Sequence, residues 1–236
     1  MKRKALSVER KKRNSDFPFS CYKTHITHHD YYPVFLNLKG KKTIVIGAGK
    51  VAERKIRALL KAGADITVIS PAITKRIERE KQKGRIRHIP RQYRKGDSNK
   101  AFLVIAATDS LEINKKVSEN ASFLVNVVDS PSLCNFIVPS VIKRGPLTIA
   151  VSTSGISPAL SKSIRKELEK LYGPEFVGYL KLLEKTRKKA MKGIKGKKRR
   201  TEFLNNLASE KVISMLRQKG FKEIYGRVKK HLSILK

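Results

Sequence analysis

Residues 42–64, which read KTIVIGAGKVAERKIRALLKAGA, decide the fold of this chain. A β-branched apolar run at 43–46 leads directly into a glycine turn, and apolar residues then recur at helical spacing. This order of strand, glycine turn and helix is the first half of a dinucleotide-binding βαβ unit. In such a unit Gly47 makes the tight turn, Gly49 lets the backbone approach a pyrophosphate, and Ala52 keeps the helix close to the strand.

The residues after this helix complete the unit. Gly63 suits the C-cap of the helix, and a second β-branched run follows at 66–69. The unit then has the roughly 30 residues expected of a βαβ motif. The free N–H groups at the start of its helix would face the phosphates. The sequence therefore predicts an α/β fold with an N-terminal Rossmann-type parallel sheet that binds a nucleotide.

The end of the second strand lacks the usual ribose ligand. About 20 residues past a glycine turn, NAD enzymes commonly place an Asp or Glu on the adenosine ribose, and this chain has Ser70 there. We expect Ser70 and backbone groups of Pro71 and Ala72 to bind the ribose instead. Because Lys75 and Arg76 follow closely, a 2′-phosphate is not excluded on charge, and the residues leave NAD and NADP as alternatives.

Two later strands each end at an aspartate. The apolar run 102–107 is typical of a parallel strand buried on both faces and stops near Asp109, and the run 123–128 stops at Asp129. Sites in parallel sheets lie at the carboxyl ends of strands, so both side chains are expected near the nicotinamide half of a cofactor. Asp109 precedes a helix and suits an N-cap, whereas Asp129 opens no obvious helix. We therefore favour Asp129 as the functional aspartate.

A turn rich in hydroxyl groups and glycine, at 152–158, follows two further predicted strands at 136–142 and 147–151. Such a turn before a helix has the form of an anion site. A well-capped helix, with Ser157 as N-cap and Pro158 at its first position, explains the same residues.

The chain divides into four parts by composition and periodicity. We expect a disordered basic tail at 1–30, a nucleotide-binding Rossmann domain at 31–138, a linking segment at 139–172 and a small all-helical domain at 173–236. Within the last part, a basic loop at 192–200 separates one helix from two more. Three histidines in the tail have no cysteine partner at zinc spacing, so we expect no metal site.

The composition suits a globular protein with a strongly basic surface. The chain has 236 residues, 40% of them hydrophobic, and 54 Lys and Arg against 19 Asp and Glu give a formal charge of +35. Such a surface attracts polyanions, namely nucleic acid, an anionic membrane or a polycarboxylate or phosphate substrate; a bias of the host proteome explains the charge equally well. Two cysteines and the lack of a membrane span or secretory signal predict a reducing cytoplasm.

Several separate motifs occur in one order and spacing: YPVFLNLKGKK, IVIGAGKVAERK, AGADITVISP, LVIAATD, NVVDSPSLCNFIVPS and RGPLTIAVSTSGISPALSKSIRKELE. Together they resemble precorrin-2 dehydrogenase, the dehydrogenase and in some members ferrochelatase module of siroheme synthase. The likeness is close over about 32–172, is weaker in the helical tail and leaves out the first 30 residues.

The resemblance implies a reaction and a set of residues. It implies NAD-dependent oxidation of precorrin-2 to sirohydrochlorin by a homodimer that interlocks through residues 139–172, with Asp129 in the chemistry. The SSGG or STGG turn of the family reads Ser152, Thr153, Ser154 and Gly155 here, so one glycine is replaced. By position the NAD contacts fall on Gly47, Gly49, Lys50, Val51, Pro71, Ala72 and Thr108.

The substrate implied by the resemblance fits the charge of the chain. Precorrin-2 is a polycarboxylate, which a cleft with Lys and Arg would bind and attract, and Arg144, Lys162 and Arg165 are candidates. Oxidation needs a hydride acceptor and a base for the proton, and Asp129 suits the base. The same carboxylate could accept the pyrrole N–H protons that are released when ferrous iron is inserted. The residues do not decide whether the protein has this second activity.

A rival hypothesis is a regulatory module that senses a ligand through its Rossmann domain and binds nucleic acid through its basic tail. The net charge and the basic clusters favour it. We expect no nucleic-acid partner, however, because the sequence has no DNA-reading helix motif and its basic residues are spread evenly.

Overall fold

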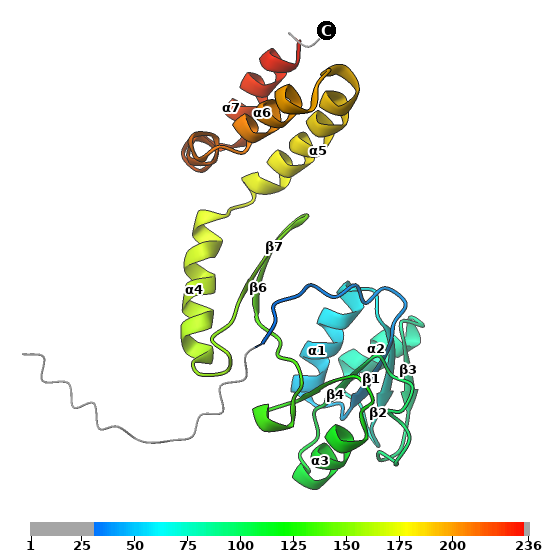
Figure 1. The fold of residues 1–236 in the computed structure, drawn as a ribbon. Helices are drawn as coiled ribbons and strands as arrows, with labels where there is room; N and C mark the ends of the chain where they lie inside the picture. The colour runs from blue at the N-terminus through cyan, green and yellow to red at the C-terminus, as the bar shows by residue number, and fades with distance from the viewer. Residues whose placement is uncertain (1–30, 234–236) are drawn as a thin grey trace, which may run out of the picture.

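The computed structural model describes residues 31–233. A five-stranded parallel sheet in the order β3-β2-β1-β4-β5 forms its N-terminal half (Figure 1). The strands and helices of this half are β1 (Lys42–Ile46), α1 (Lys50–Lys61), β2 (Asp65–Ile69), α2 (Lys75–Gln82), β3 (Ile86–Ile89), β4 (Leu103–Ala106), α3 (Leu111–Asn120) and β5 (Leu124–Val127). The predicted Rossmann-type sheet is confirmed, and the predicted tail lies outside the described residues.

Both faces of the sheet are covered by helices. Alternate residues of the central strands point to opposite faces, so Val45 packs in one core cluster and Ile46 in the other. The first cluster contains Ile56 of α1 and Ile77 of α2, and the second contains Val117 of α3. Strands buried on both faces explain the continuous apolar runs in the sequence.

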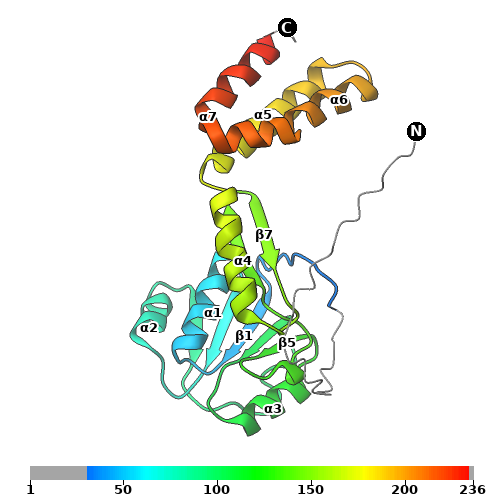
Figure 2. The same cartoon turned by 90° about the vertical axis from the view of Figure 1, so that its left-hand side faces the viewer.

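An antiparallel hairpin and a long helix follow the sheet. The hairpin consists of β6 (Ser140–Arg144) and β7 (Leu147–Val151), and α4 (Pro158–Leu171) packs along it (Figure 2). Helix α4 begins after Ser157, whose hydroxyl accepts the Leu160 N–H. The predicted cap of this helix is confirmed.

The predicted strand at 136–142 is wrong in its first half. Residues before Ser140 form a short 3-10 turn, η1 (Pro131–Leu133), and an irregular segment along β5. Asn135 holds this segment on β5 through its backbone N–H, which donates to the Val125 carbonyl, and through its side-chain amide, which accepts the Val125 N–H at 2.8 Å and donates to the Phe123 carbonyl. Side-chain bonds of this kind leave no apolar pattern for sequence reasoning to detect.

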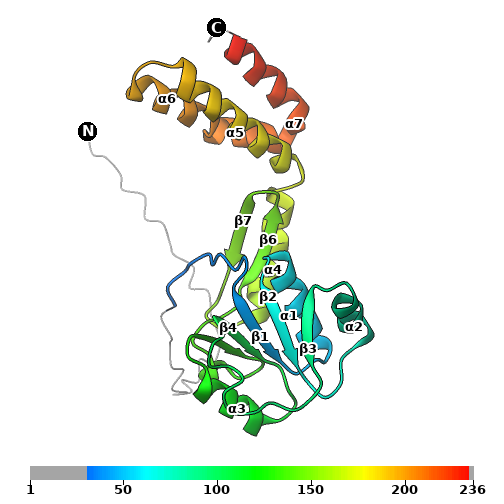
Figure 3. The same ribbon diagram turned by 90° about the vertical axis from the view of Figure 1, so that its right-hand side faces the viewer.

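Three helices form the C-terminal unit: α5 (Glu175–Gly193), α6 (Lys197–Leu207) and α7 (Glu210–Ser233). They pack around their own core cluster, beyond the hairpin and away from the sheet (Figure 3). The predicted loop at 192–200 is wrong, because α6 begins at Lys197 after Gly196. A basic run resembles a loop by charge, yet Lys and Arg are good helix formers.

Candidate functional site

Two cavities meet the carboxyl edge of the sheet on either side of the start of α1. The first, of about 470 Å³, lies at the ends of β1, β2 and β4, where the strand order of the sheet reverses between β1 and β4. The second, of about 320 Å³, lies between the end of β5, α1 and the hairpin. The edge where the strand order reverses is the usual ligand position in open α/β sheets.

The first cavity has the form of a dinucleotide site. Gly47 leaves β1 with a φ of +91° and donates its N–H to the Ile69 carbonyl at 2.9 Å. Gly49 is the N-cap of α1 and supplies no side chain to it, whereas Thr74 and Ser110 cap α2 and α3 with their hydroxyls. The first N–H groups of α1 therefore have no intrahelical or capping partner and suit a phosphate.

The space above the turn also fits a bound pyrophosphate. A Cβ built on Gly49 meets no atom within 4 Å, so this glycine is not needed for packing of the protein itself. It lines the cavity together with Gly47. An open approach to the backbone at this position is what a dinucleotide requires of the second glycine.

The residues predicted to bind the ribose lie in the same cavity. Ser70, Pro71 and Ala72 line it, and Ser70 is buried. The Ser70 N–H donates to the Ile89 carbonyl, and its own carbonyl lies 2.8 Å from His88 Nε2. The backbone around Ser70 is thus held by the neighbouring strand β3.

Thr108, a predicted cofactor contact, lines the cavity from the end of β4. Its hydroxyl donates toward Asn114 Oδ1 at 2.8 Å, and the Asn114 amide donates back to the Thr108 carbonyl at 2.9 Å. Sequence reasoning missed Asn114, a buried polar residue on α3. The expectation that Asp109 caps α3 is wrong, because Ser110 is the cap and Asp109 lines the cavity.

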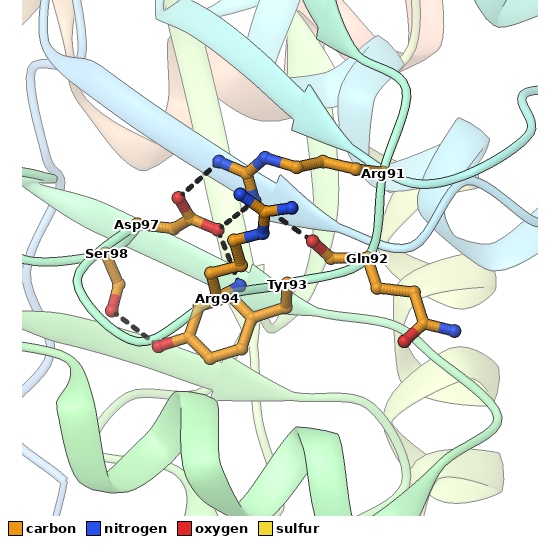
Figure 4. A network of polar contacts seen from close by, with 6 residues as sticks. All are labelled: Arg91, Gln92, Tyr93, Arg94, Asp97 and Ser98. Carbon is orange, nitrogen blue, oxygen red and sulfur yellow. Dashed lines mark hydrogen bonds and ion pairs between the residues drawn. The ribbon is translucent and has the colours of Figure 1, made fainter.

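A braced loop between β3 and β4 forms another wall of this cavity (Figure 4). Arg91 binds both oxygens of Asp97 through its two terminal nitrogens, each at 2.8 Å. Tyr93 lines the cavity, and its hydroxyl lies 3.2 Å from Ser98 Oγ. Gln92 lines the cavity with an amide that bonds to no other described residue. No hydrophobic periodicity marks this loop, so sequence reasoning missed it.

The second cavity gathers residues from distant segments. Asp129 lines it from the end of β5, and Ser152, Thr153 and Ser154 line it from the turn before α4. Asp129 has a φ of +58°, a conformation that is uncommon for residues other than glycine and often marks functional sites. The structure thus brings together the predicted catalytic residue and the predicted hydroxyl-rich turn.

Part of that turn is occupied by its own hydrogen bonds. Thr153 Oγ1 accepts the Ser157 N–H and donates to the Ser157 carbonyl, each at 3.0 Å. Ser152 Oγ accepts the Ser154 N–H at 3.0 Å. The Ser154 hydroxyl bonds to no other residue in the range 31–233 and remains available to a ligand.

Three predicted substrate cations lie outside the lining of this cavity. Arg144 donates through Nε to the Tyr172 carbonyl at 2.9 Å, and Arg165 forms an ion pair with Glu169. Lys162 is exposed on α4. The positive charges that do line the cavity belong to Arg54 and Lys55 of α1.

Sequence reasoning missed Lys55. Its Nζ lies 3.4 Å from Asn126 Oδ1 on β5, and burial, with a contribution from Arg54, lowers the pKa of its ammonium. Asn126 is itself buried and donates to the Phe136 carbonyl at 3.1 Å. The signal that could have found it is its spacing of four residues from Val51, which places both side chains on one face of α1.

No group of three or more His, Cys, Asp or Glu residues that could hold a metal ion comes together between residues 31 and 233. Cys134 lines the second cavity, and its sulfur forms a hydrogen bond with the backbone by accepting the Val127 N–H at 3.1 Å. Desolvation raises its pKa. Within the same part of the chain, no helix is long and apolar enough to cross a membrane.

Two family models match the chain. The model described as "Putative NAD(P)-binding" matches residues 34–140, and the model described as "Sirohaem biosynthesis protein central" matches residues 144–171. The first model covers the whole five-stranded sheet, including the strand ends that line the two cavities. The second model covers β7, the hydroxyl-rich turn and α4.

Among similar sequences are two siroheme synthases. That of Methylobacillus flagellatus is 43% identical over 142 residues, which are 59% of this chain and 30% of the relative. That of Thioalkalivibrio sulfidiphilus is 40% identical over 181 residues, 75% of this chain and 37% of the relative. The chain thus spans about a third of the length of these relatives.

A solved structure is similar to most of this chain. It is that of SirC, precorrin-2 dehydrogenase, which is 30% identical, with a TM-score of 0.72, over 85% of this chain and 100% of that chain. On this similarity, which covers the whole of that relative, the chain belongs to the precorrin-2 dehydrogenase family.

Proposed function

We propose that the protein oxidises precorrin-2 to sirohydrochlorin with NAD. The observation that carries the proposal is the position of α1 between the two cavities. Its N-terminus, with Gly49, faces the dinucleotide cavity, and its next turn, with Lys55, faces the cavity that holds Asp129. A cofactor and a second ligand would therefore meet at one edge of the sheet.

The residues of the first cavity would hold the dinucleotide. The uncapped N–H groups of α1 suit its pyrophosphate, and Ser70, Pro71 and Ala72 suit its adenosine ribose. NAD, when bound, supplies the hydride acceptor for the oxidation. Ser70 stands where an acidic residue would indicate NAD, so the residues do not distinguish NAD from NADP. We propose NAD because of the family to which the chain belongs.

Asp129 is the proposed base. Loss of two hydrogens from a reduced tetrapyrrole releases a proton as well as a hydride, and a carboxylate beside the reacting carbon accepts that proton. Asp129, with its left-handed backbone, lines the second cavity together with the hydroxyl-rich turn. Ser154 would contribute a hydrogen bond to the substrate.

The direct test is an anaerobic incubation of precorrin-2 with NAD, followed by absorbance. Asp129→Asn keeps the side-chain shape and removes the base, and turnover should fall by roughly a hundredfold or more while NAD binding is retained. An Asp129→Asn enzyme as active as wild type would remove Asp129 from the mechanism. Tight, salt-dependent DNA binding without any tetrapyrrole turnover would support the rival regulatory function instead.

Adding ferrous iron to the same incubation tests metal insertion, which stays a prediction. Iron would be a substrate, and Asp129 would take the pyrrole protons. Absorbance separates no reaction, oxidation alone, and oxidation followed by metal insertion. The cytoplasmic location also stays a prediction and would be checked by fractionation of cells that express the protein.

A homodimer is the proposed assembly, with residues 139–172 as its interface. Apolar side chains are exposed along the hairpin and the start of α4, including Val141, Ile156 and Leu160 at 44–58% exposure. Patches of this kind mark protein contacts. Val141→Glu should convert a dimer to a monomer in light scattering coupled to gel filtration, and an unchanged mass would place the interface elsewhere.

A further inference from the structure

Lys55 is a partly buried cation in the second cavity, and the proposed reaction gives it no role so far. Its position is set by its place on α1. Lys55 lies on the face of α1 that also carries Val51 and Arg54, all three of which line the cavity. The adjacent side of α1 packs through Ala52 and Ile56 in the core beside the sheet, which fixes the rotation of the helix about its axis.

The ammonium group of Lys55 is held by an amide and not by a carboxylate. Its Nζ contacts Asn126 Oδ1 at 3.4 Å, and within residues 31–233 it forms no salt bridge, although the Asp129 carboxylate acts on it from a distance and opposes the effect of burial on its pKa. Asn126 is 8% exposed, and its Nδ2 donates to the Phe136 carbonyl at 3.1 Å, which fixes Oδ1 toward Lys55. A neutral acceptor orients the cation without neutralising it.

The charge balance of the cavity favours an anionic ligand. Arg54 and Lys55 are its positive groups, and Asp129 is its one negative group. Arg165 and Arg144, which charge alone suggests as substrate ligands, are already bound to Glu169 and to the Tyr172 carbonyl. Burial of an ammonium group is costly unless it acquires a partner, and a ligand carboxylate would supply that partner.

We propose that Lys55, oriented by Asn126, binds a carboxylate of the tetrapyrrole and so positions the macrocycle against Asp129. The inference rests on the proposed function. Because Lys55 and the pyrophosphate-binding N-terminus belong to one helix, the same rigid element would set both the cofactor and the substrate. Desolvation lowers the pKa of Lys55 in the free protein, and a bound carboxylate would oppose that effect.

The test uses Lys55→Met, which keeps most of the apolar stem and removes the charge, and Lys55→Arg, which keeps the charge. Tetrapyrrole binding is measured directly, by absorbance titration with sirohydrochlorin in the absence of NAD, and NAD binding is measured separately. Loss of one charge-assisted hydrogen bond corresponds to roughly a tenfold or greater rise in the sirohydrochlorin Kd. We expect this rise for Lys55→Met, partial recovery for Lys55→Arg and an NAD Kd within about twofold of wild type in both.

Arg57→Gln is the matched control. Arg57 is an exposed residue of the same helix, outside the lining of this cavity. The Arg57→Gln substitution removes one positive charge, as Lys55→Met does, and should leave the sirohydrochlorin Kd within about twofold of wild type. If Arg57→Gln weakens binding as much as Lys55→Met, overall charge explains the affinity and the inference is wrong.

Asn126→Ala tests the positioning role. It removes the oxygen that orients Lys55 and should weaken sirohydrochlorin binding by a smaller factor than Lys55→Met does. In the Asn126→Ala and Lys55→Met double variant the two effects should not add, because Asn126 acts only through Lys55. Additive effects would overturn the role of Asn126.

The inference and the proposed function fail in different ways. A wild-type protein that neither binds sirohydrochlorin nor oxidises precorrin-2 refutes the proposed function. A wild-type protein that does both, together with a Lys55→Met variant that retains NAD binding and binds sirohydrochlorin as tightly, refutes only the role of Lys55. NAD binding thus also reports that each variant is folded.

Discussion

Gly47 and Ala107 approach each other so closely that a Cβ at Gly47 would lie 2.3 Å from the Ala107 carbonyl oxygen. The two residues follow β1 and β4, the adjacent strands at which the sheet order reverses. Gly47 also has a positive φ of +91°. The floor of the dinucleotide cavity thus depends on a position without a side chain.

Gly47→Ala should therefore destabilise the fold. The new methyl group clashes with backbone that cannot move without breaking the β1–β4 pairing, and the positive φ adds strain. We expect the free energy of unfolding to fall by about 2–4 kcal/mol, measured by urea denaturation and far-UV circular dichroism. A variant of wild-type stability would mean that the turn relaxes at no cost.

Gly49→Ala separates binding from stability. A Cβ there meets no protein atom, and the backbone has a φ of −73°, which alanine adopts readily. Stability should stay within about 0.5 kcal/mol of wild type, while the methyl group blocks the approach of the pyrophosphate and NAD binding falls by tenfold or more. Calorimetric titration with NAD measures this loss, and unchanged affinity would place the pyrophosphate elsewhere.

The parts of the fold that follow a strong local pattern were predictable. The β-branched runs at β1 and β2 and the glycine turn specify the sheet and the dinucleotide cavity. The position of Asp129 beside the second cavity was predictable because parallel strands end at one edge of the sheet. These features depend on residues close together in the sequence.

The remaining parts depend on contacts between distant residues. Lys55 is one of many lysines in a basic chain, and only its approach to Asn126, 71 residues away, distinguishes it. Asn135 holds the chain along β5 with its side chain, so the expected strand begins late. Arg144 and Arg165 suit a substrate by charge, but the fold gives them partners that no spacing reveals.

The Arg91–Asp97 pair predicts a pH dependence of stability. Arg91 lowers the pKa of Asp97 through two hydrogen bonds, and the Arg94 N–H lowers it further. Because the pKa is depressed in the folded state, this contribution is present above the ordinary Asp value of about 3.9 and is lost as pH falls through the folded-state value. Asp97→Asn should flatten the acid limb of the urea midpoint plotted against pH.

A comparison with an exposed pair gives this experiment its control. Asp65 pairs with Arg87 at 3.1 Å, and the two side chains are 40% and 65% exposed, more than those of Asp97 and Arg91. Solvent screens such a pair, so Asp65→Asn should change the urea midpoint little near neutral pH. An acid limb that is the same in Asp97→Asn and wild type would show that the loop opens before Asp97 titrates.

Ser154 occupies a backbone conformation that suits glycine. Its φ is +52°, and in the family pattern a glycine stands there. Ser154→Gly should raise the free energy of unfolding by about 0.5–1 kcal/mol, because relief of the left-handed strain exceeds the entropic cost of glycine. Ser154→Ala keeps the strain and should give no gain in thermal unfolding, so an equal gain in both variants would contradict this explanation.

Thr186 of α5 carries a buried hydroxyl without a partner. The residue is 1% exposed, and its Oγ1 has no hydrogen bond to any residue of the described chain. Thr186→Val keeps the shape and removes the unsatisfied group, so the C-terminal unit should gain about 1 kcal/mol. Thr186→Ala removes a methyl group as well and leaves a small cavity, which should cancel the gain or cause a net loss of about 1 kcal/mol. Since the chain has no tryptophan, circular dichroism at the helix bands is the measurement, and a loss of stability in Thr186→Val would show that the hydroxyl has a partner in solution.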